Sequence, residues 1–477
     1  MSIRFMAACA IAALLAAGAA QAADPSPPKG SRPASVHARF KVLQQDFQSG
    51  PEVTKACLTC HKDAAKQLHK TEHWKWEYVN PAGQVLGKRH VVNNFCTSTT
   101  SNFGACASCH IGYVMKDPKT FDFKSETNVD CLVCHDTTGK YRKPSGLAGN
   151  VLANDTELIP GSGKVIKGVD LRTIAKSVGR SSRASCGSCH FLGGGGDGVK
   201  HGDMDSSLEA PDAQLDVHMD AKGLNFTCAS CHRTTNHDVP GSRYGPMGVT
   251  LTCNSCHSDA PHASKDINRH VAKIACQTCH IPSMARGGVP TKLSWDWSTA
   301  GQRGPDGKPL VKRNDAGYEV YMGIKGDFKW GENVVPEYAW FNGKISYTLP
   351  TDKLDPSKGP VYINRFQGTP NDGKSKIWPV KVFRAKQAWD PVNRTLAVTH
   401  LAGNDATAYW TNLDWPKAVA TGMAAAGMPF SGKVGFIETY SMWPITHMVA
   451  PKAQALACEA CHNENGRMKN VPGVSPE

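Results

Sequence analysis

One short pattern, Cys-x-x-Cys-His, occurs eight times in the chain, and no other feature constrains the fold as strongly. The copies use sixteen of the eighteen cysteines, and four of them fall between Cys186 and His280. In chain order they are Cys57/Cys60/His61, Cys106/Cys109/His110, Cys131/Cys134/His135, Cys186/Cys189/His190, Cys228/Cys231/His232, Cys253/Cys256/His257, Cys276/Cys279/His280 and Cys458/Cys461/His462.

The spacing within the pattern has a specific chemical use. Two cysteines three positions apart lie on one side of a helical turn, so both sulfurs can bond to the vinyl groups of a single haem. The histidine that follows is placed to ligate the iron. A zinc site has no need of histidine at the fifth position every time, and a redox dithiol would occur once. The pattern therefore predicts eight covalently attached haems, each with the histidine of its own motif as an iron ligand.

Spacing and composition suggest how such a chain is organised. Apart from the last, the motifs follow one another at about 20 to 55 residues, too close for a separate domain around each haem. The expected fold is mainly α with extensive loops and little β structure, built around the haems. Residues 23–50 are expected to form a loosely ordered lead-in, and 51–280 the haem-binding core with seven motifs. Residues 281–477, with nine of the eleven tryptophans and the eighth motif, are expected to wrap this core.

Charge and the first residues indicate export rather than nucleic-acid binding. The formal charge of +13 comes from dispersed basic residues, which suit the propionate groups of the haems better than a nucleic acid. Residues 1–22 have the pattern of a secretory signal, with Arg4, an apolar run and the cleavage site Ala20-Gln21-Ala22. No later stretch has the ~20 apolar residues of a membrane span. We therefore expect a soluble periplasmic protein after cleavage.

Counting possible iron ligands leaves the function open. Nineteen histidines less eight in the motifs leave eleven, enough to fill every distal position. A haem with histidine on both faces is suited to electron transfer, whereas a haem with a vacant position can bind substrate. Cys96 is the one cysteine outside the signal and the motifs, and it has no disulfide partner. An electron carrier with eight bis-histidine haems and an enzyme both remain possible.

Several stretches resemble the octahaem tetrathionate reductases. They are Asn93–Cys96, Ala175–Gly179, the fourth motif with Phe191 and Gly193–Gly196, Lys200–Asp203 and Asp216–Met219, and the order of all eight motifs also matches. The resemblance implies that one haem, on the second motif, has a lysine ligand, an open face and a free cysteine nearby. Cys96 matches the cysteine and Lys176 the lysine, with Lys167 and Lys200 as alternatives. The seven remaining distal ligands are then expected to be His73, His201, His218, His237, His262, His270 and His447.

What the resemblance implies for activity is a respiratory reductase. Such an enzyme cleaves the central S–S bond of tetrathionate with two electrons and also reduces nitrite or hydroxylamine to ammonium. Either a thiolate at Cys96 attacks a sulfur of tetrathionate as in disulfide exchange, or one sulfur of the substrate ligates the iron directly. The expected electron donor is a quinol-oxidising membrane cytochrome or a periplasmic cytochrome. Some relatives also bind calcium, although no EF-hand loop occurs here.

Two departures from related enzymes bear on the direction of the reaction. Pentahaem nitrite reductases attach the catalytic haem through Cys-x-x-Cys-Lys, which is absent from this chain. Hydroxylamine oxidoreductases cross-link the catalytic haem to a tyrosine beyond the last motif, but only fifteen residues follow His462 and none is tyrosine. Hydroxylamine oxidation is therefore the weaker alternative to reduction.

Overall fold

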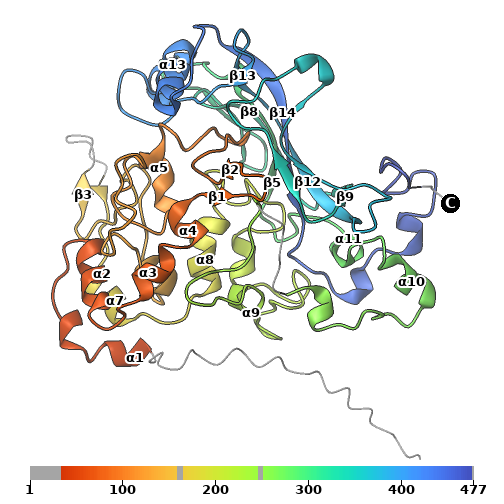
Figure 1. Cartoon of the computed structure of the whole chain (residues 1–477), viewed down its shortest axis with the longest axis horizontal. Coiled ribbons are helices and arrows are strands. Elements are labelled where there is room, and N and C mark those ends of the chain that lie inside the picture. Colours follow the sequence, from red (N-terminus) through yellow and green to blue (C-terminus); the bar gives the residue numbers. More distant parts are fainter. Residues whose placement is uncertain (1–33, 158–164, 245–250, 475–477) are drawn as a thin grey trace, which may run out of the picture. The chain divides into compact units, whose positions relative to one another are not determined.

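The structure is a computed structural model that describes residues 34–157, 165–244 and 251–474. The predicted signal and its cleavage site lie outside the described residues. Up to residue 280 the chain forms short helices and turns, and beyond it most of the regular structure is β (Figure 1). No described helix is both long enough and apolar enough to cross a membrane.

The helices of the first part are short, and most of them carry a motif. Three motifs are preceded by a Ser or Thr that caps the turn together with the serine three residues later: Ser182 with Ser185, Thr227 with Ser230, and Thr252 with Ser255. The helices are α1 (Ala34–His37), α2 (Gly50–Leu58), α3 (Ala64–Leu68), α4 (Glu72–Lys75), α5 (Phe103–Cys106), α6 (Leu132–His135), α7 (Leu171–Lys176), α8 (Arg183–His190), α9 (Cys228–Cys231), α10 (Lys265–His270) and α11 (Cys276–His280).

Single 3-10 turns and two small hairpins complete this part. The turns are η1 (Lys41–Leu43), η2 (Ala107–Cys109), η3 (Ser206–Glu209) and η4 (Cys253–Ser255). The hairpins pair β1 (Tyr78–Val79) with β2 (Val85–Leu86), and β3 (Thr156–Glu157) with β4 (Val165–Ile166).

Ten strands from the rest of the chain form one sheet. Its main path runs β10-β11-β14-β12-β5-β8-β7-β6, and β9 and β13 also pair with β12. The strands are β5 (Thr291–Asp296), β6 (Val311–Arg313), β7 (Glu319–Met322), β8 (Gly326–Gly331), β9 (Glu337–Phe341), β10 (Ile345–Tyr347), β11 (Val361–Phe366), β12 (Lys376–Asp390), β13 (Thr395–Leu396) and β14 (Gly435–Pro444). The remaining elements are α12 (Tyr409–Asn412), α13 (Trp415–Ala426), η5 (Trp297–Thr299), η6 (Pro356–Lys358), η7 (Lys452–Gln454) and η8 (Cys458–Ala460).

The expectation of a mainly α chain with little β structure is not borne out, since 23% of the residues are helical and 19% lie in strands. The central strand β12 shows why. Buried Phe383 and Ala385 alternate there with exposed Arg384 and Lys386, the period of two that marks a sheet with one covered face. The sheet has its own aromatic core, so haems are not needed to fill it.

The sheet also holds a loop from the first part of the chain. Asn94 is fully buried, and its amide donates to the carbonyls of Phe383 on β12 (3.2 Å) and Thr439 on β14 (3.1 Å). Ser441 on β14 donates back to the Asn94 carbonyl oxygen at 2.7 Å. The sheet therefore fixes the position of Cys96, two residues further along.

Candidate functional site

Six motif histidines each face a second histidine ring. Two imidazole nitrogens that each lie about 2 Å from one metal place their ring centroids about 6 Å apart, and the six observed separations all match this value. The pairs are His61–His37 (6.3 Å), His190–His73 (6.2 Å), His135–His237 (6.4 Å), His257–His218 (6.3 Å), His280–His262 (6.0 Å) and His462–His270 (5.9 Å). Each pair has room for one iron between its rings, so these residues fit bis-histidine haems.

Hydrogen bonds orient several of these rings. The Nδ1 atom of His135 lies 2.8 Å from the Gly179 carbonyl, and that of His270 lies 2.8 Å from the Asp266 carbonyl. The Nδ1 atom of His237 lies 2.7 Å from Gln67 Oε1. A proton held on Nδ1 by such an acceptor leaves Nε2 free to bind iron.

The pairs include five of the seven predicted distal ligands: His73, His218, His237, His262 and His270. The structure does not pair His201 with another histidine; its ring packs edge-on against Trp443, with centroids 5.2 Å apart. His37 takes the place opposite His61 instead. The sequence did not predict His37 as a ligand because it lies in residues 23–50, which were expected to be loosely ordered. The sequence showed only that His37 is one of the eleven histidines outside the motifs.

The fifth motif departs from the expected bis-histidine arrangement. Its histidine, His232, was expected to have a distal histidine opposite it, but within the described residues no histidine ring faces His232 at the spacing of the six pairs. The Nδ1 atom of His232 lies 3.0 Å from the Pro240 carbonyl. A proton on Nδ1 directed at this carbonyl leaves Nε2 free, so His232 keeps the orientation of an iron ligand although its distal partner is not in place.

The nearest candidate for that partner is His447, whose charge interacts with that of Cys228 in the same motif. Its Nδ1 atom lies 3.1 Å from Oδ2 of the buried carboxylate Asp203, which also accepts the backbone N–H groups of Thr446 (2.7 Å) and His447 (3.0 Å). Four of the paired histidines, His135, His237, His262 and His270, instead have a carbonyl or amide oxygen beside Nδ1. The Nδ1 atom of His218 lies 3.8 Å from a carboxylate oxygen of Asp216, further away than Asp203 is from His447. His447 thus remains the candidate distal ligand for the fifth haem, with an anion behind it.

Asp203→Asn is expected to raise the midpoint potential of one haem by about 60 mV, because loss of the anion makes His447 a weaker donor to oxidised iron. A tenfold change in the stability of the oxidised haem relative to the reduced haem corresponds to about 59 mV for one electron. Spectropotentiometric titration of the holoprotein measures the shift. Asp205→Asn is the matched control, since Asp205 is equally buried but bonds to Ser207. An unchanged set of potentials in Asp203→Asn would show that the anion does not tune this haem.

The second motif differs from the rest. His110 is fully buried between Trp74 (centroids 5.4 Å apart) and Trp76 (5.0 Å), and its Nε2 atom lies 2.7 Å from the Trp74 carbonyl. A nitrogen that donates to a carbonyl has no lone pair for iron. Among the described residues, no histidine ring faces His110 at the spacing of the six pairs. This motif therefore lacks the bis-histidine arrangement.

A buried lysine lies beside the second motif. Lys143 Nζ is 2.5 Å from the His110 carbonyl, 3.0 Å from the Gly112 carbonyl and 3.0 Å from Oδ2 of Asp130, and its side chain is 2% exposed. Tyr113 donates to Oδ1 of Asp130 at 2.8 Å and so fixes the carboxylate. The chain thus places an amine at an attachment site that has no second histidine.

Two of the lysines expected from the resemblance lie elsewhere. Lys176 ends α7, which packs against α1, α2 and η1, and its amine is 3.4 Å from Gln44 Oε1. Lys167 forms an exposed ion pair with Asp155 at 2.6 Å. The structure brings neither to the second motif.

The third, Lys200, lies closer to the second motif. Its amine is 4.7 Å from the ring centroid of Trp443, and its charge interacts with that of Cys109. Lys143 is the better candidate ligand, because its amine is bonded to the carbonyl of the motif histidine itself. Sequence reasoning missed Lys143 because it follows no periodic pattern and its burial depends on Asp130, so only the fold identifies it.

The free thiol is close to the second motif. Cys96 packs against the aromatic cluster of the large sheet, and its charge interacts with those of Cys106, Lys325 and Lys292. Burial, and secondarily Cys106, raises the pKa of Cys96 to about 12, while the two lysines oppose the shift. Cys106 loses its charge when haem is attached, but the burial remains. Cys96 is therefore a protonated thiol at neutral pH, whereas the sequence led us to expect a thiolate.

Interactions between motif sulfurs indicate which attachment sites are neighbours. The sulfurs of four pairs lie close together: Cys57 with Cys131, Cys109 with Cys189, Cys186 with Cys228, and Cys253 with Cys276. Charge interactions link Cys134 with Cys186, Cys231 with Cys256, and Cys279 with Cys461. The attachment sites therefore form a line from the eighth motif through the seventh, sixth and fifth to the fourth. The fourth motif adjoins both the second and the third, and the third adjoins the first.

The two cysteines of the first motif have different surroundings, which the sequence did not predict. Cys60 is exposed, whereas Cys57 is partly buried and contacts the sulfur of Cys131. The close partner of the Cys60 sulfur is the hydroxyl of its neighbour Thr59, at 3.8 Å.

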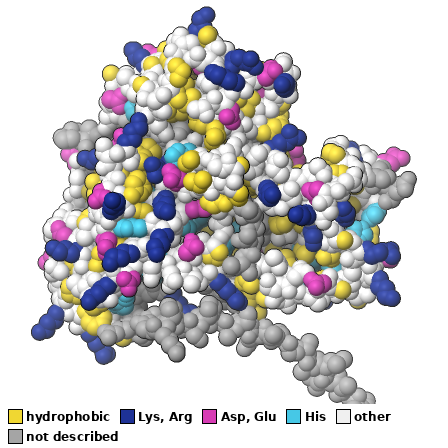
Figure 2. Space-filling view, viewed as in Figure 1, with side chains coloured by type: hydrophobic (Ala, Val, Ile, Leu, Met, Phe, Trp, Pro, Cys, Tyr) yellow, Lys and Arg dark blue, Asp and Glu magenta, His cyan; other side chains and the backbone are white. Residues whose placement is uncertain are grey.

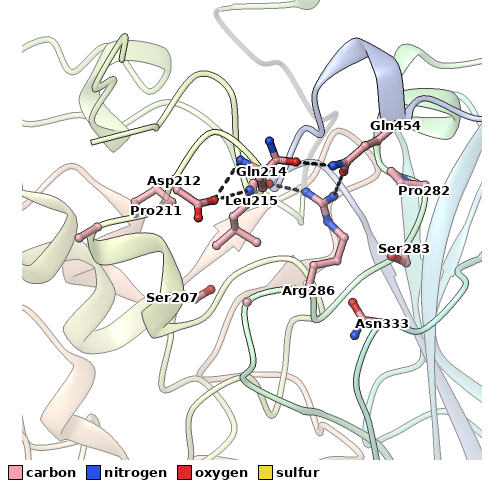
Figure 3. A pocket seen from close by; sticks show the side chains of 12 residues that line it. Ser207, Pro211, Asp212, Gln214, Leu215, Pro282, Ser283, Arg286, Asn333 and Gln454 are labelled. Atoms are coloured by element: carbon pink, nitrogen blue, oxygen red, sulfur yellow. Dashed lines mark hydrogen bonds between the residues drawn. The ribbon is translucent and has the colours of Figure 1, made fainter. Parts of the chain in front are cut away.

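One hollow in the described surface has no motif residue in its lining. It has a volume of about 610 Å³, and none of its lining residues is a motif cysteine or a paired histidine. Figure 3 shows Arg286 reaching across it toward Gln454 and the carbonyl of Leu215, with Gln214 bonded to Gln454. No residue of the second motif lines this hollow.

Comparisons with known proteins agree with this picture. A family model described as bacterial cytochrome c matches residues 292–465. A 238-residue stretch is 27% identical to an uncharacterised protein of Archaeoglobus fulgidus, covering 42% of this chain and 78% of that protein. The crystal structure of an octahaem cytochrome c from Shewanella oneidensis is similar over 91% of this chain and 95% of its own, with 42% identity and a TM-score of 0.81. The chain therefore belongs to the multihaem c-type cytochromes, with covalently bound haem c and a redox role.

Proposed function

We propose that this cytochrome is a reductase that binds its substrate at the second haem and reduces tetrathionate to thiosulfate, and nitrite or hydroxylamine to ammonium. The observation that supports this most directly is the contrast between motifs. Six motif histidines face another histidine, whereas His110 is bonded to a backbone carbonyl and lies beside Lys143. A haem ligated by Lys143 alone keeps one position vacant.

In this proposal Lys143, rather than Lys176, is the axial ligand of the second haem. An amine binds iron only when deprotonated, and burial together with the charge of the metal favours that form. Asp130, whose Oδ2 atom lies 3.0 Å from the amine, holds the lysine side chain in place beside the motif. Cys106 and Cys109 would hold the haem and Lys143 would ligate its iron, and the haem would supply the electrons for the reduction.

Cations around this site suit an anionic substrate. The charges of Lys88 and Lys143 act on Cys109, and those of Lys292 and Lys325 act on Cys96. Elsewhere on the visible face Lys and Arg are spread among Asp and Glu, without a large single-sign patch (Figure 2). A local excess of positive charge attracts nitrite and tetrathionate and raises their concentration at the site.

The remaining sites serve electron delivery. The six facing pairs, and the fifth motif with His232 and His447, suit saturated haems that exchange electrons without binding substrate. In the order given by the sulfur contacts, electrons that enter at the eighth haem reach the second through the fourth. A quinol-oxidising or periplasmic cytochrome as donor, and a periplasmic location, belong to the same proposal. Among the described residues, no group of three or more His, Cys, Asp or Glu side chains points to a calcium site.

Titration of the oxidised holoprotein with nitrite or hydroxylamine tests the proposal. Absorption and EPR spectra are expected to change for one haem and to stay unchanged for seven, and reduced protein is expected to turn over both substrates. If no ligand perturbs any haem and no substrate is reduced, the chain is an electron carrier with eight saturated haems.

A further inference from the structure

A second lysine near Cys96 is enclosed by aromatic rings. Lys292 lies on β5, and its Nζ is 3.5 Å from the ring centroid of Phe328, 4.2 Å from that of Trp295 and 4.7 Å from that of Trp330. The residue is 5% exposed. The same aromatic cluster packs against Cys96, so the amine and the thiol share one environment.

No protein acceptor holds this amine. In the part of the chain that the structure describes, Lys292 Nζ forms no hydrogen bond and no ion pair. Two other buried lysines are different: Lys381 donates to the Val199 carbonyl (2.8 Å) and to Thr291, and Lys143 is paired with Asp130. Aromatic faces attract a cation but do not accept its protons in strong hydrogen bonds. The protons of Lys292 are thus available to another molecule.

The charges around Lys292 favour loss of a proton near neutral pH. Burial, and then the charge of Lys325, lowers the pKa of Lys292 to about 7, against the opposing effects of Glu319 and Cys96. A donor whose pKa lies near the working pH both gives and regains a proton readily.

We propose that Lys292 is the proton donor for nitrogen-oxide substrates at the second haem. This inference rests on the proposed function. Cleavage of the N–O bond of hydroxylamine consumes two electrons and two protons and gives ammonia and water. The electrons come from the reduced haems c, the Lys292 ammonium protonates the departing hydroxyl group to form water, and solvent restores both the lysine proton and the second proton. Cleavage of tetrathionate consumes two electrons and no proton, so it does not need a proton from Lys292.

The test compares two substrates in Lys292→Met holoprotein with a reduced dye as electron source. We expect hydroxylamine kcat to fall by about 100-fold at pH 7, within the range for loss of a general acid, while tetrathionate kcat falls by no more than about tenfold, because Lys292 acts on that reaction only through its positive charge near Cys96. In the wild-type protein, hydroxylamine kcat should decline as pH rises through about 7, because the ammonium is lost; tetrathionate kcat should show no such decline.

Two further variants give readouts that a structural role would not move. Lys325→Met removes a neighbouring positive charge, so the pH at which hydroxylamine kcat declines should rise. Lys292→Ala should regain hydroxylamine turnover when methylammonium is added, because the small amine can occupy the aromatic cage.

The outcomes separate the two proposals. If the wild-type protein reduces neither substrate and no ligand perturbs a haem, the proposed function fails. If hydroxylamine turnover is present but Lys292→Met retains its rate and pH profile, only the role of Lys292 is overturned. Equal loss of kcat with both substrates, at full haem content and without rescue by methylammonium, also overturns it.

Discussion

Lys143→Ala is expected to abolish turnover of tetrathionate and hydroxylamine, by more than about 100-fold, while seven of the eight haems keep their spectra. The reason is that the second haem loses its protein axial ligand, and loss of even an outer partner of a metal ligand typically costs 10- to 100-fold. EPR and absorption spectra of the oxidised holoprotein, combined with steady-state assays, measure both effects.

Lys176→Ala distinguishes the two lysines. Its amine is bonded to Gln44, and its helix packs against α1 and α2, so the variant should keep the spectrum and turnover of the second haem. If Lys176→Ala altered the second haem and Lys143→Ala did not, the assignment of the ligand from the structure would be wrong. Lys143→Arg adds a third comparison, because it keeps the charge beside Asp130 but cannot supply a neutral amine.

Cys96→Ala is expected to lower tetrathionate turnover by about 100-fold and hydroxylamine turnover by no more than a few fold, because only the sulfur substrate needs a thiolate nucleophile. The thiolate attacks a central sulfur of tetrathionate, forming a Cys–S–S–SO₃⁻ adduct and releasing one thiosulfate. Two electrons from the haems then cleave the adduct, releasing the second thiosulfate and restoring the thiolate. Equal losses with both substrates would mean that Cys96 has a general structural role.

The raised pKa of Cys96 gives this step a signature in pH. Only the thiolate attacks, and with a pKa near 12 its fraction increases tenfold for each pH unit below that value. Tetrathionate turnover should therefore rise with pH across the neutral range, opposite in direction to hydroxylamine turnover. A flat tetrathionate profile would indicate that the sulfur binds iron without attack by Cys96.

The sequence was sufficient for the features that depend on local chemistry. The eight predicted attachment sites follow from a five-residue spacing, and five of the predicted distal histidines, such as His237 and His262, lie close in sequence to motifs and face a motif histidine. His37 and Lys143 were missed because their roles depend on partners that only the fold supplies: His61 across an iron site, and Asp130 in a buried ion pair.

Burial and sheet formation were the least predictable features. The motif spacing does not indicate how deeply a cysteine is buried, so the solvent exposure of Cys60 could not be predicted from it. The sheet was missed because the haems were expected to fill the interior, so the alternation around Phe383 was not weighed.

The junction of attachment sites at the fourth motif has a consequence for multi-electron chemistry. If the second haem binds substrate as proposed, it forms a terminal branch, because its attachment site adjoins only that of the fourth motif among the sulfur interactions described. Electron transfer between the two arms, one ending at the first motif and the other at the eighth, would then not pass through the iron that binds substrate. A substrate bound at the second haem could receive electrons stored on the haems of both arms. An inhibitor bound there would stop turnover but would not block electron transfer among the other haems.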